Sequence, residues 1–232
     1  MRCKLVFGLS LVILGPSSAA SPDLTSAARI ALAAYVQPVP APYNWTGIYV
    51  GANAGFGFAT ASTAATFSGL AVTGSENLTG FVGGGQLGGD YQIGSIVVGL
   101  EADFDYSAQS HTTTVGAFSA TDSIPWIGTL RGRIGYAVDR ALIYVTAGGA
   151  EGKFSSTFTA NGIASISGSK THGAWTAGGG IEIGQTGNLS ARLEYLYLDT
   201  GNINLGTLFG VTVTGRVQDN FIRAGLNWRF PL

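Results

Sequence analysis

The chain contains eight segments in which apolar residues alternate with small or polar ones, separated by gaps that are alternately short and long. Side chains of a β-strand point to opposite faces at a period of two, so each segment would carry one apolar face and one small or polar face. The segments span about 44–60, 78–91, 96–106, 124–136, 142–154, 172–184, 189–199 and 219–230. This pattern predicts eight amphipathic strands.

The gaps indicate how these strands are connected. Three short gaps are rich in turn-forming residues, whereas the four long gaps, near 61–77, 107–123, 155–171 and 200–218, are rich in Ser, Thr, Ala and Gly. Short turns at one end, longer external loops at the other and an even strand number are typical of outer-membrane barrels. A bilayer offers no water to an open sheet edge, so a β-protein that spans it has to close on itself. We therefore predict an all-β fold, an eight-stranded antiparallel up-and-down transmembrane β-barrel over residues 44–230.

The composition excludes other classes of protein. Only 11% of the residues are charged, compared with about 25% in a typical soluble domain, although 46% are hydrophobic. After the first 20 residues no apolar run approaches the roughly 18 residues that a membrane helix needs. The net charge of −1 provides no basic field, which argues against a nucleic-acid partner.

The start of the chain has the pattern of an export signal. Arg2 and Lys4 precede a ten-residue apolar run, which is followed by small residues suited to cleavage, so we predict a signal peptide over residues 1–20. Residues 21–43 contain several prolines, which favour extended chain, and we predict an N-terminal linker there. The single cysteine, Cys3, lies in the signal, so the processed protein would have no disulfide and no cysteine metal site.

The polar faces of the predicted strands carry acidic and basic residues in equal number. The five acids are Glu101, Asp103, Asp105, Glu182 and Glu194, and the five bases are Arg131, Arg133, Arg192, Arg223 and Arg229. An eight-stranded barrel is only wide enough to be filled by side chains, and paired charges could fill it and satisfy one another. We therefore predict a charge network in the barrel interior. The alternative is a soluble barrel or sandwich, in which the same charges would face water.

The apolar faces place Trp and Tyr residues near strand ends, where they suit the two membrane–water interfaces. We predict aromatic belts formed by Tyr91, Trp126, Tyr136, Trp175, Tyr197 and Trp228. A soluble protein with so few charges would be poorly covered, which favours the transmembrane interpretation over the soluble one.

No group of residues has the pattern of a catalytic or cofactor site. Residues 83–88 match the Gly-x-Gly-x-x-Gly spelling of nucleotide sites, but they lie inside a strand pattern with no helix after it. His111 and His172 fall in predicted external loops, where ordinary solvated residues are the simplest interpretation and a metal or haem contact is the functional one. Gly-x-Ser-x-Gly does not occur. We predict no enzymatic activity, no cofactor and no metal site.

Six short stretches, taken in order, resemble a known family. They are Trp45–Gly51, Gly83–Gly88, Val98–Asp103, Thr129–Tyr136, Glu194–Tyr197 and Arg223–Phe230. Together they resemble the porin-like outer membrane immunogenic protein group of small outer-membrane β-barrels from Gram-negative bacteria, over about residues 44–230. The resemblance implies an eight-stranded barrel related to the OmpA membrane domain. The family usually ends on an aromatic residue that the insertion machinery recognises, whereas Pro231 and Leu232 follow Phe230 here.

The resemblance implies a surface protein of the outer membrane of a Gram-negative bacterium, with an envelope-structural or surface-interaction role. Its partners would be outer-membrane lipid, the outer-membrane assembly machinery during biogenesis, and an external ligand at the loops. Two alternatives stay open: a narrow porin for small solutes, and binding of haem or a host ligand through the external loops.

Overall fold

A computed structural model describes residues 43–67, 70–160, 164–185, 187–208 and 211–232 of the chain. The predicted signal peptide, residues 1–20, and the predicted linker up to residue 42 lie outside the described residues. None of the described residues forms a helix long and apolar enough to cross a membrane.

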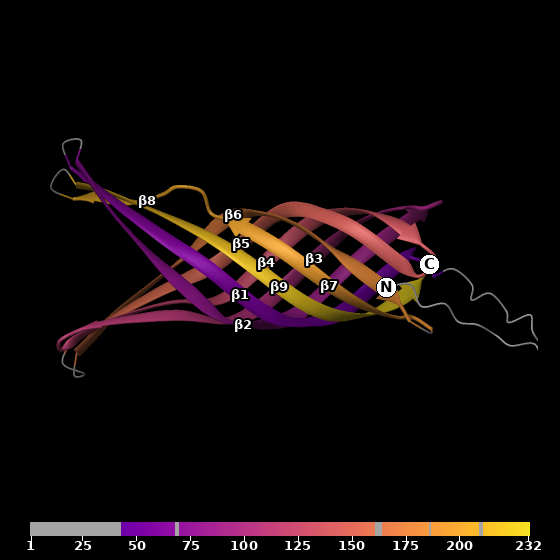
Figure 1. Cartoon of the computed structure of the whole chain (residues 1–232), viewed down its shortest axis with the longest axis horizontal. Helices are drawn as coiled ribbons and strands as arrows, with labels where there is room; N and C mark the ends of the chain where they lie inside the picture. Colours follow the sequence, from indigo (N-terminus) through magenta and orange to yellow (C-terminus); the bar gives the residue numbers. More distant parts are fainter. Residues whose placement is uncertain (1–42, 68–69, 161–163, 186, 209–210) are drawn as a thin grey trace, which may run out of the picture. The chain divides into compact units, whose positions relative to one another are not determined.

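The described chain folds into nine strands, each antiparallel to its neighbours. They are β1 (Gly47–Phe67), β2 (Leu70–Ile93), β3 (Ile96–Val115), β4 (Phe118–Val138), β5 (Ala141–Ala160), β6 (Ala164–Gly184), β7 (Leu189–Asp199), β8 (Ile203–Leu208) and β9 (Val211–Pro231). Eight of them form a ring in the order β1–β2–β3–β4–β5–β6–β7–β9, which closes by pairing of β9 with β1 (Figure 1). The prediction of an eight-stranded antiparallel barrel is confirmed, and the short strand β8 adds to β9 outside the ring.

The ring has its apolar side chains outside and its charges inside. Leu100 and Leu130 point outward and are about two-thirds exposed, at 66% and 65%. Arg131 and Glu182 point inward and are 1% and 0% exposed. This is the reverse of a soluble barrel, because an exterior covered by Leu, Ile, Val and Phe needs lipid around it.

One end of the barrel has tight turns between its strands. β2 and β3 are joined by Gly94 and Ser95, and β4 and β5 by Asp139 and Arg140. The first residue of each turn has a positive φ, 61° at Gly94 and 52° at Asp139, which is the conformation that tight hairpins require there. Short turns mark the periplasmic end of an outer-membrane barrel, so we call this the turn end.

The four long gaps at the opposite end are mostly strand, which corrects the prediction of polar loops. β3 and β4, for example, continue until a two-residue turn at Gly116 and Ala117, inside the gap predicted as a loop at 107–123. Thr is favoured in strands, and the hydroxyls of Thr112 and Thr121 hydrogen-bond across this hairpin at 3.0 Å. A composition of Ser, Thr and Gly therefore did not distinguish a solvated strand from a loop.

Beyond the ring, the strands separate into two groups (Figure 1). The β2–β3 ladder ends at the pair Thr79–Ser110, and the β6–β7 ladder ends at the pair Trp175–Asp199. Above these points β2, β1, β9 and β8 remain paired as one sheet, and β3, β4, β5 and β6 as another. We call them the first and the second half-sheet.

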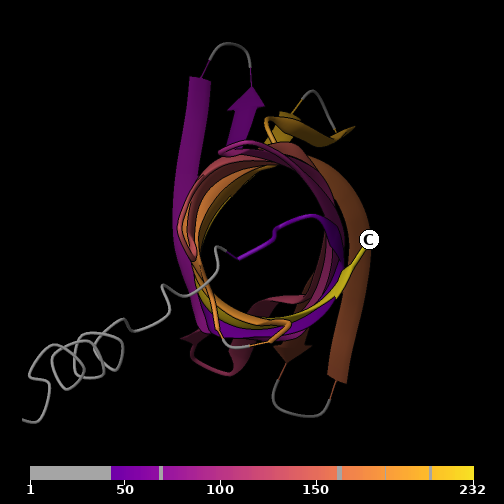
Figure 2. The same ribbon diagram turned by 90° about the vertical axis from the view of Figure 1, so that its right-hand side faces the viewer.

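The chain before β1 lies inside the barrel. Strand β1 begins at Gly47, so the prediction that the first strand starts at residue 44 was three residues early. Figure 2 shows the indigo chain ahead of β1 running across the inside of the ring. Tyr43 and Trp45 are buried there, at 8% and 0% exposed.

Candidate functional site

All ten charged residues predicted to face the interior are buried inside the ring, each less than 7% exposed. They come from strands that lie opposite one another across the barrel as well as from neighbouring strands. The alternation of residues placed them on the inner face, and closure of the ring brings them together. The resulting cluster fills the middle of the lumen.

Arg131 on β4 has partners on three strands. Its Nη2 atom lies 2.5 Å from Glu101 Oε1 and 2.6 Å from Asp103 Oδ2, both on β3. Its Nη1 atom lies 3.0 Å from Glu194 Oε1 on β7, and its Nε donates to Thr129 Oγ1 at 2.9 Å. The guanidinium thus crosses the lumen and connects one wall of the barrel to the other.

Two further guanidiniums, those of Arg133 and Arg229, lie toward the turn end. Arg133 Nη2 is 2.9 Å from Glu182 Oε2, and Arg229 Nη2 is 2.9 Å from Asp90 Oδ2. Between them, Tyr49 accepts a hydrogen bond from Arg133 Nη1 at 3.0 Å, and its ring centroid lies 4.8 Å from the Arg229 guanidinium. These contacts join β1, β2, β4, β6 and β9.

The remaining two arginines are Arg223, which extends the cluster away from the turn end, and Arg192, which lies opposite Glu182 in the β6–β7 register. Arg223 Nη1 lies 3.1 Å from Asp103 Oδ1 and also pairs with Asp105, while its Nη2 lies 2.7 Å from Glu194 Oε2. Arg192 is 3.6 Å from the same Glu194 oxygen. The Glu194 carboxylate therefore contacts three guanidiniums: Arg192 and Arg223 lie close to Oε2, and Arg131 lies close to Oε1.

Asp90 is a member of the cluster that the sequence interpretation left out. With it, six carboxylates face five guanidiniums among the described residues of the cluster, where equal numbers were expected. Asp90 lies on the same inner face of β2 as Gln86, so the period-two pattern carried the signal. Amide side chains complete the network: Gln86 Nε2 donates to Asn227 Oδ1 at 2.6 Å, and Asn53 Nδ2 donates to Gln86 Oε1 at 2.9 Å.

The pairing makes this burial energetically possible. A single buried ion costs several kcal/mol of lost hydration, and attraction offsets that cost only when the partners are close and their hydrogen bonds are satisfied. Here each arginine has at least two acidic partners within 4 Å. Loss of one member would leave its partners buried and unpaired, which is the expensive case.

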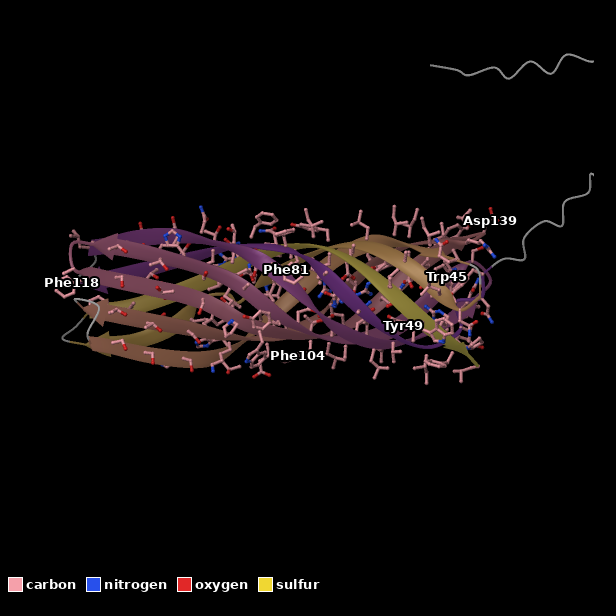
Figure 3. The ribbon with its side chains drawn as sticks, turned by 90° about the horizontal axis from the view of Figure 1, so that it is seen from below. Trp45, Tyr49, Phe81, Phe104, Phe118 and Asp139 are labelled. Atoms are coloured by element: carbon pink, nitrogen blue, oxygen red, sulfur yellow. The ribbon has the colours of Figure 1, made fainter. Side chains whose placement is uncertain are left out.

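Residues 43–46 close the lumen at the turn end, and we call them the N-terminal plug. Arg229 Nη1 donates to the Trp45 carbonyl at 2.5 Å, and the Tyr43 and Trp45 rings pack 4.6 Å apart. Tyr43 also donates from its hydroxyl to the Asn188 carbonyl at 3.2 Å. Trp45 and Tyr49 lie near the end of the barrel that carries Asp139 (Figure 3).

The glycine run at residues 83–88 contributes space in the barrel wall. It lies inside β2 with strand on both sides, as the sequence pattern indicated. A methyl group on Gly88 would overlap the Tyr49 ring, so glycine at this position lets the tyrosine lie flat against the wall.

A mainly apolar layer, which we call the apolar collar and in which Gln109 donates to Asp219 at 2.9 Å, separates the charge cluster from the outer mouth. It is formed by buried residues on the inner face: Ala59, Leu78, Val82, Ile124, Ile127, Ala150, Leu196, Leu198 and Phe221. Along β7, Leu196 and Leu198 follow Glu194, which places the collar directly above the charges. The alternation of polar and apolar faces did not predict this layer, because two inward leucines on β7 look like ordinary strand residues.

A cleft of about 440 Å³ lies above the collar, between the two half-sheets. Its lining includes Glu76 and Val217 from the first half-sheet and Asp122, Phe154 and His172 from the second. Six further lining residues carry hydroxyl groups: Ser62, Thr63, Ser75, Ser123, Ser155 and Ser156. This cleft is a concave feature at the end of the barrel opposite the turn end.

The two histidines lie on strands instead of in the predicted loops. His172 is on β6, lines the cleft and packs against Phe154 with ring centroids 6.0 Å apart. His111 is on β3, opposite Asp122 in the β3–β4 register. Across the described ranges, no group of three or more His, Cys, Asp or Glu residues is placed to hold a metal ion. Haem binding through these residues stays a prediction.

The six predicted belt residues lie on the outer face of the ring. Tyr91, Tyr136 and Trp228 lie near the turn end, and the other three lie near the opposite margin of the ring. There Trp126 stacks on Phe104 at 5.5 Å, and Trp175 packs on Tyr197 at 5.4 Å. Figure 3 shows Phe81 and Phe104 on the same outer surface, which adds phenylalanines that were not predicted. Their role as membrane-interface belts stays a prediction.

Residues 26–230 match the family model described as the outer membrane protein beta-barrel domain. The chain belongs to this family. It is 34% identical over 239 residues to the 31 kDa outer-membrane immunogenic protein of Brucella melitensis, covering 94% of this chain and 99% of the relative. It is 33% identical over 203 residues to the 25 kDa outer-membrane immunogenic protein of Brucella abortus, covering 83% and 85%. Among solved structures, Neisserial surface protein A is similar at 15% identity and a TM-score of 0.40, covering 80% of this chain and 98% of that one.

The family membership confirms the resemblance that the six short stretches indicated. It also confirms the predicted location in the outer membrane and the class of β-barrel surface protein. Outer-membrane lipid is therefore the medium around the apolar exterior of the ring.

Proposed function

We propose that this protein is a closed barrel whose working part is the pair of half-sheets outside the membrane, with a role in surface interaction. The ring would serve as the anchor, and the cleft with its surrounding strands would serve as the contact region. No catalytic step is part of the proposal. The assembly machinery would act on the barrel during biogenesis, and an external partner would meet the half-sheets afterwards.

The observation that carries the proposal is that the lumen is occupied at three levels. The N-terminal plug fills the turn end, the charge cluster fills the middle, and the apolar collar lies beneath the mouth. An ion on this path would have to displace paired guanidiniums and then cross an apolar constriction, which gates channels by dewetting. This filling favours an anchor over the narrow porin that the sequence left open.

Planar-bilayer recording tests the closed state. We expect no stable, reproducible single-channel steps from the full-length protein, because no continuous hydrated path crosses the three levels. A conducting porin inserted in the same bilayers provides the positive control. Recovery of protease-resistant, heat-modifiable protein from matching liposomes shows that a silent recording does not reflect failed insertion. Well-defined conductance steps of uniform size would contradict the proposal and favour the porin.

The names of the Brucella relatives add a surface aspect to the proposal. Those proteins are called immunogenic, and we propose that the half-sheets are the corresponding exposed part of this chain. Protease added to intact cells should cut at the outer tips of the half-sheets, for example at the β3–β4 turn of Gly116 and Ala117, and leave the ring protected. If the tips resisted protease on intact cells and were cut only after lysis, the half-sheets would lie on the periplasmic side of the membrane, which would contradict the proposal.

A further inference from the structure

On the β2–β3 side of the barrel, the separation of the half-sheets leaves two strand edges without a neighbour in the described chain. On β2, Leu70–Leu78 pairs with β1, but the ladder to β3 begins only at Thr79. On β3, His111–Val115 pairs with β4, although its last partner on β2 is opposite Ser110. We call the gap between these two segments the open seam.

A strand edge of this kind presents backbone N–H and C=O groups that point away from the sheet. In an antiparallel sheet, alternate residues direct these groups to one side and then to the other. Nine residues of β2 therefore offer a row of donors and acceptors about 30 Å long, at roughly 3.4 Å per residue. Such a row is a template for one more strand.

The edge lacks the features with which proteins usually block such pairing. Proteins protect exposed edges with lysines, prolines, bulges or very short strands. The segment Leu70–Leu78 contains no lysine and no proline, and Glu76 is its single charged residue. Its residues from Leu70 to Ser75 are all exposed. The edge is thus accessible along most of its length.

The side chains beside the edge would meet those of an added strand. Gly74, Glu76 and Leu78 face the cleft and form part of its lining. A methyl group on Gly74 would meet no atom within 4 Å, so there is open space above the backbone. Alternate side chains of an added strand would therefore enter the cleft, and a basic one opposite Glu76 would gain an opposite-charge pair.

We propose that the free edge of β2 binds an extended peptide segment of a partner protein by antiparallel strand addition, with preference for a basic residue opposite Glu76. This proposal rests on the proposed surface-interaction function and specifies its partner class. Main-chain hydrogen bonds supply the affinity in this binding mode, and alternate side chains in neighbouring pockets supply the specificity.

The chain itself provides a probe sequence, because β1 already pairs with the other edge of this segment in a defined register. Strand β1 pairs with this same segment of β2, from Ala59 opposite Leu78 to Phe67 opposite Leu70. A labelled synthetic peptide copying residues 59–67 is therefore able to pair with the sequence of β2 as a strand. In that register Ala61 lies opposite Glu76. We would measure its binding to the full-length protein in micelles by fluorescence anisotropy.

Backbone methylation of the probe distinguishes strand addition from side-chain binding. One peptide carries N-methyl groups at Thr60, Ser62, Ala64 and Thr66, and the other carries them at Ala61, Thr63 and Ala65. Only one of these sets can point toward β2, so we expect one methylated peptide to lose at least tenfold in affinity and the other to retain it. Equal effects of the two sets, or no binding by the unmodified peptide, would overturn the proposal.

Charge at the position opposite Glu76 provides the matched test of register. The Ala61→Lys peptide should bind more tightly than the unmodified peptide, and the Ala61→Glu peptide more weakly. In the Glu76→Gln protein this ranking should disappear, while binding of the unmodified peptide persists. If the same order of peptide affinities persisted in the Glu76→Gln protein, the peptide would not lie beside Glu76, and binding at the β2 edge would be contradicted.

Two further outcomes distinguish a failure of this inference from a failure of the proposed surface-interaction function. If light scattering shows that the micellar protein is a dimer and the probe binds only after dissociation, a second copy occupies the edge and the proposal fails. If the barrel is silent in bilayers and its tips are exposed on cells, but no peptide binds, the inference fails alone. A conducting barrel would instead contradict the proposed function.

Discussion

Arg131 shows how much of this structure depends on single interior side chains. From one position on β4 it binds carboxylates of Glu101, Asp103 and Glu194, so it neutralises charge on both sides of the lumen. None of these groups is reached by water, since each side chain is no more than 2% exposed. The stability of the ring therefore depends on complete pairing more than on any one contact.

Replacing this residue should destabilise the folded barrel. Arg131→Leu leaves three buried carboxylates short of a partner, and we expect a loss of about 3–5 kcal/mol in the free energy of unfolding. Urea titration of the protein in liposomes, followed by heat-modifiable gel migration, measures the change. Lys170→Leu is the control, because Lys170 is exposed on β6 above the membrane and should change stability by less than about 0.5 kcal/mol. An Arg131→Leu protein as resistant as the parent would contradict the interior network.

On the outer face of the ring, which lies against lipid, an apolar side chain is favoured and a charged one is costly. Leu100 faces outward and is the fifth residue of β3, within the ring, so Leu100→Arg would place a charge in the hydrocarbon layer. We expect a cost of about 2–4 kcal/mol if the position lies near the bilayer midplane. Leu70→Arg, at the exposed outer tip of β2, should cost almost nothing in the same unfolding assay. Similar costs at both positions would mean that lipid does not surround the ring.

At the scale of elements, the contact between β7 and β9 holds the first half-sheet where the ring ends. Arg216 on β9 donates from Nε to Asp199 Oδ1 at 3.0 Å, and the Gly201 amide donates to the same oxygen at 2.8 Å. Asp199 is the last residue of β7, so this pair fixes the turn that leads into β8. The position of β8 beside β9 depends on that turn.

This contact should depend on pH. The hydrogen bond from Arg216 lowers the pKa of the Asp199 carboxyl to about 2, below its ordinary value near 4. A lowered pKa stabilises the folded form above the ordinary value and loses that contribution as pH falls through the lowered one. We therefore expect β8 to detach as pH drops from about 4 to about 2, with faster proteolysis near residues 200–204. Arg216→Ala should show this faster proteolysis at neutral pH. An unchanged cleavage rate in that variant would contradict the role of the pair.

At the scale of the whole molecule, the ring and the half-sheets differ in how the backbone polar groups of their strands are satisfied. Within the membrane every strand of the ring has two neighbours, because an unpaired edge in lipid would cost several kcal/mol for each polar group. Outside the membrane water can satisfy the backbone, and there the ladders β2–β3 and β6–β7 end. We therefore expect the point of separation to lie at the outer membrane–water interface.

Amide hydrogen exchange should divide the molecule at that point. Amides of the ring should exchange slowest, whereas those of Leu70–Leu78 that face the open seam should exchange orders of magnitude faster. Mass spectrometry of peptides from the micellar protein measures both. The segment Ala59–Thr66 of β1 is a matched reference, since it pairs with β2 on one side and with β9 on the other. Equal protection of the two segments would show that the seam is closed.

The sequence alone determined the number of ring strands, their antiparallel order and the face on which each charge lies. Alternation at a period of two is a local property, so residues such as Glu101, Arg131 and Leu100 could be assigned to a side without knowledge of their neighbours. The same reasoning should have included Asp90, which lies on the inner face of β2.

Tertiary structure decided which of those residues meet and where the sheet opens. The contact of Arg131 with Glu194, 63 positions apart in the chain, exists only because closure brings opposite walls within reach of one guanidinium. The placement of Trp45 inside the lumen and the end of the β2–β3 ladder at Thr79 have no periodic signature either. Period-two patterning fixes the direction of a side chain, but contacts across the barrel depend on the curvature and stagger of the whole ring.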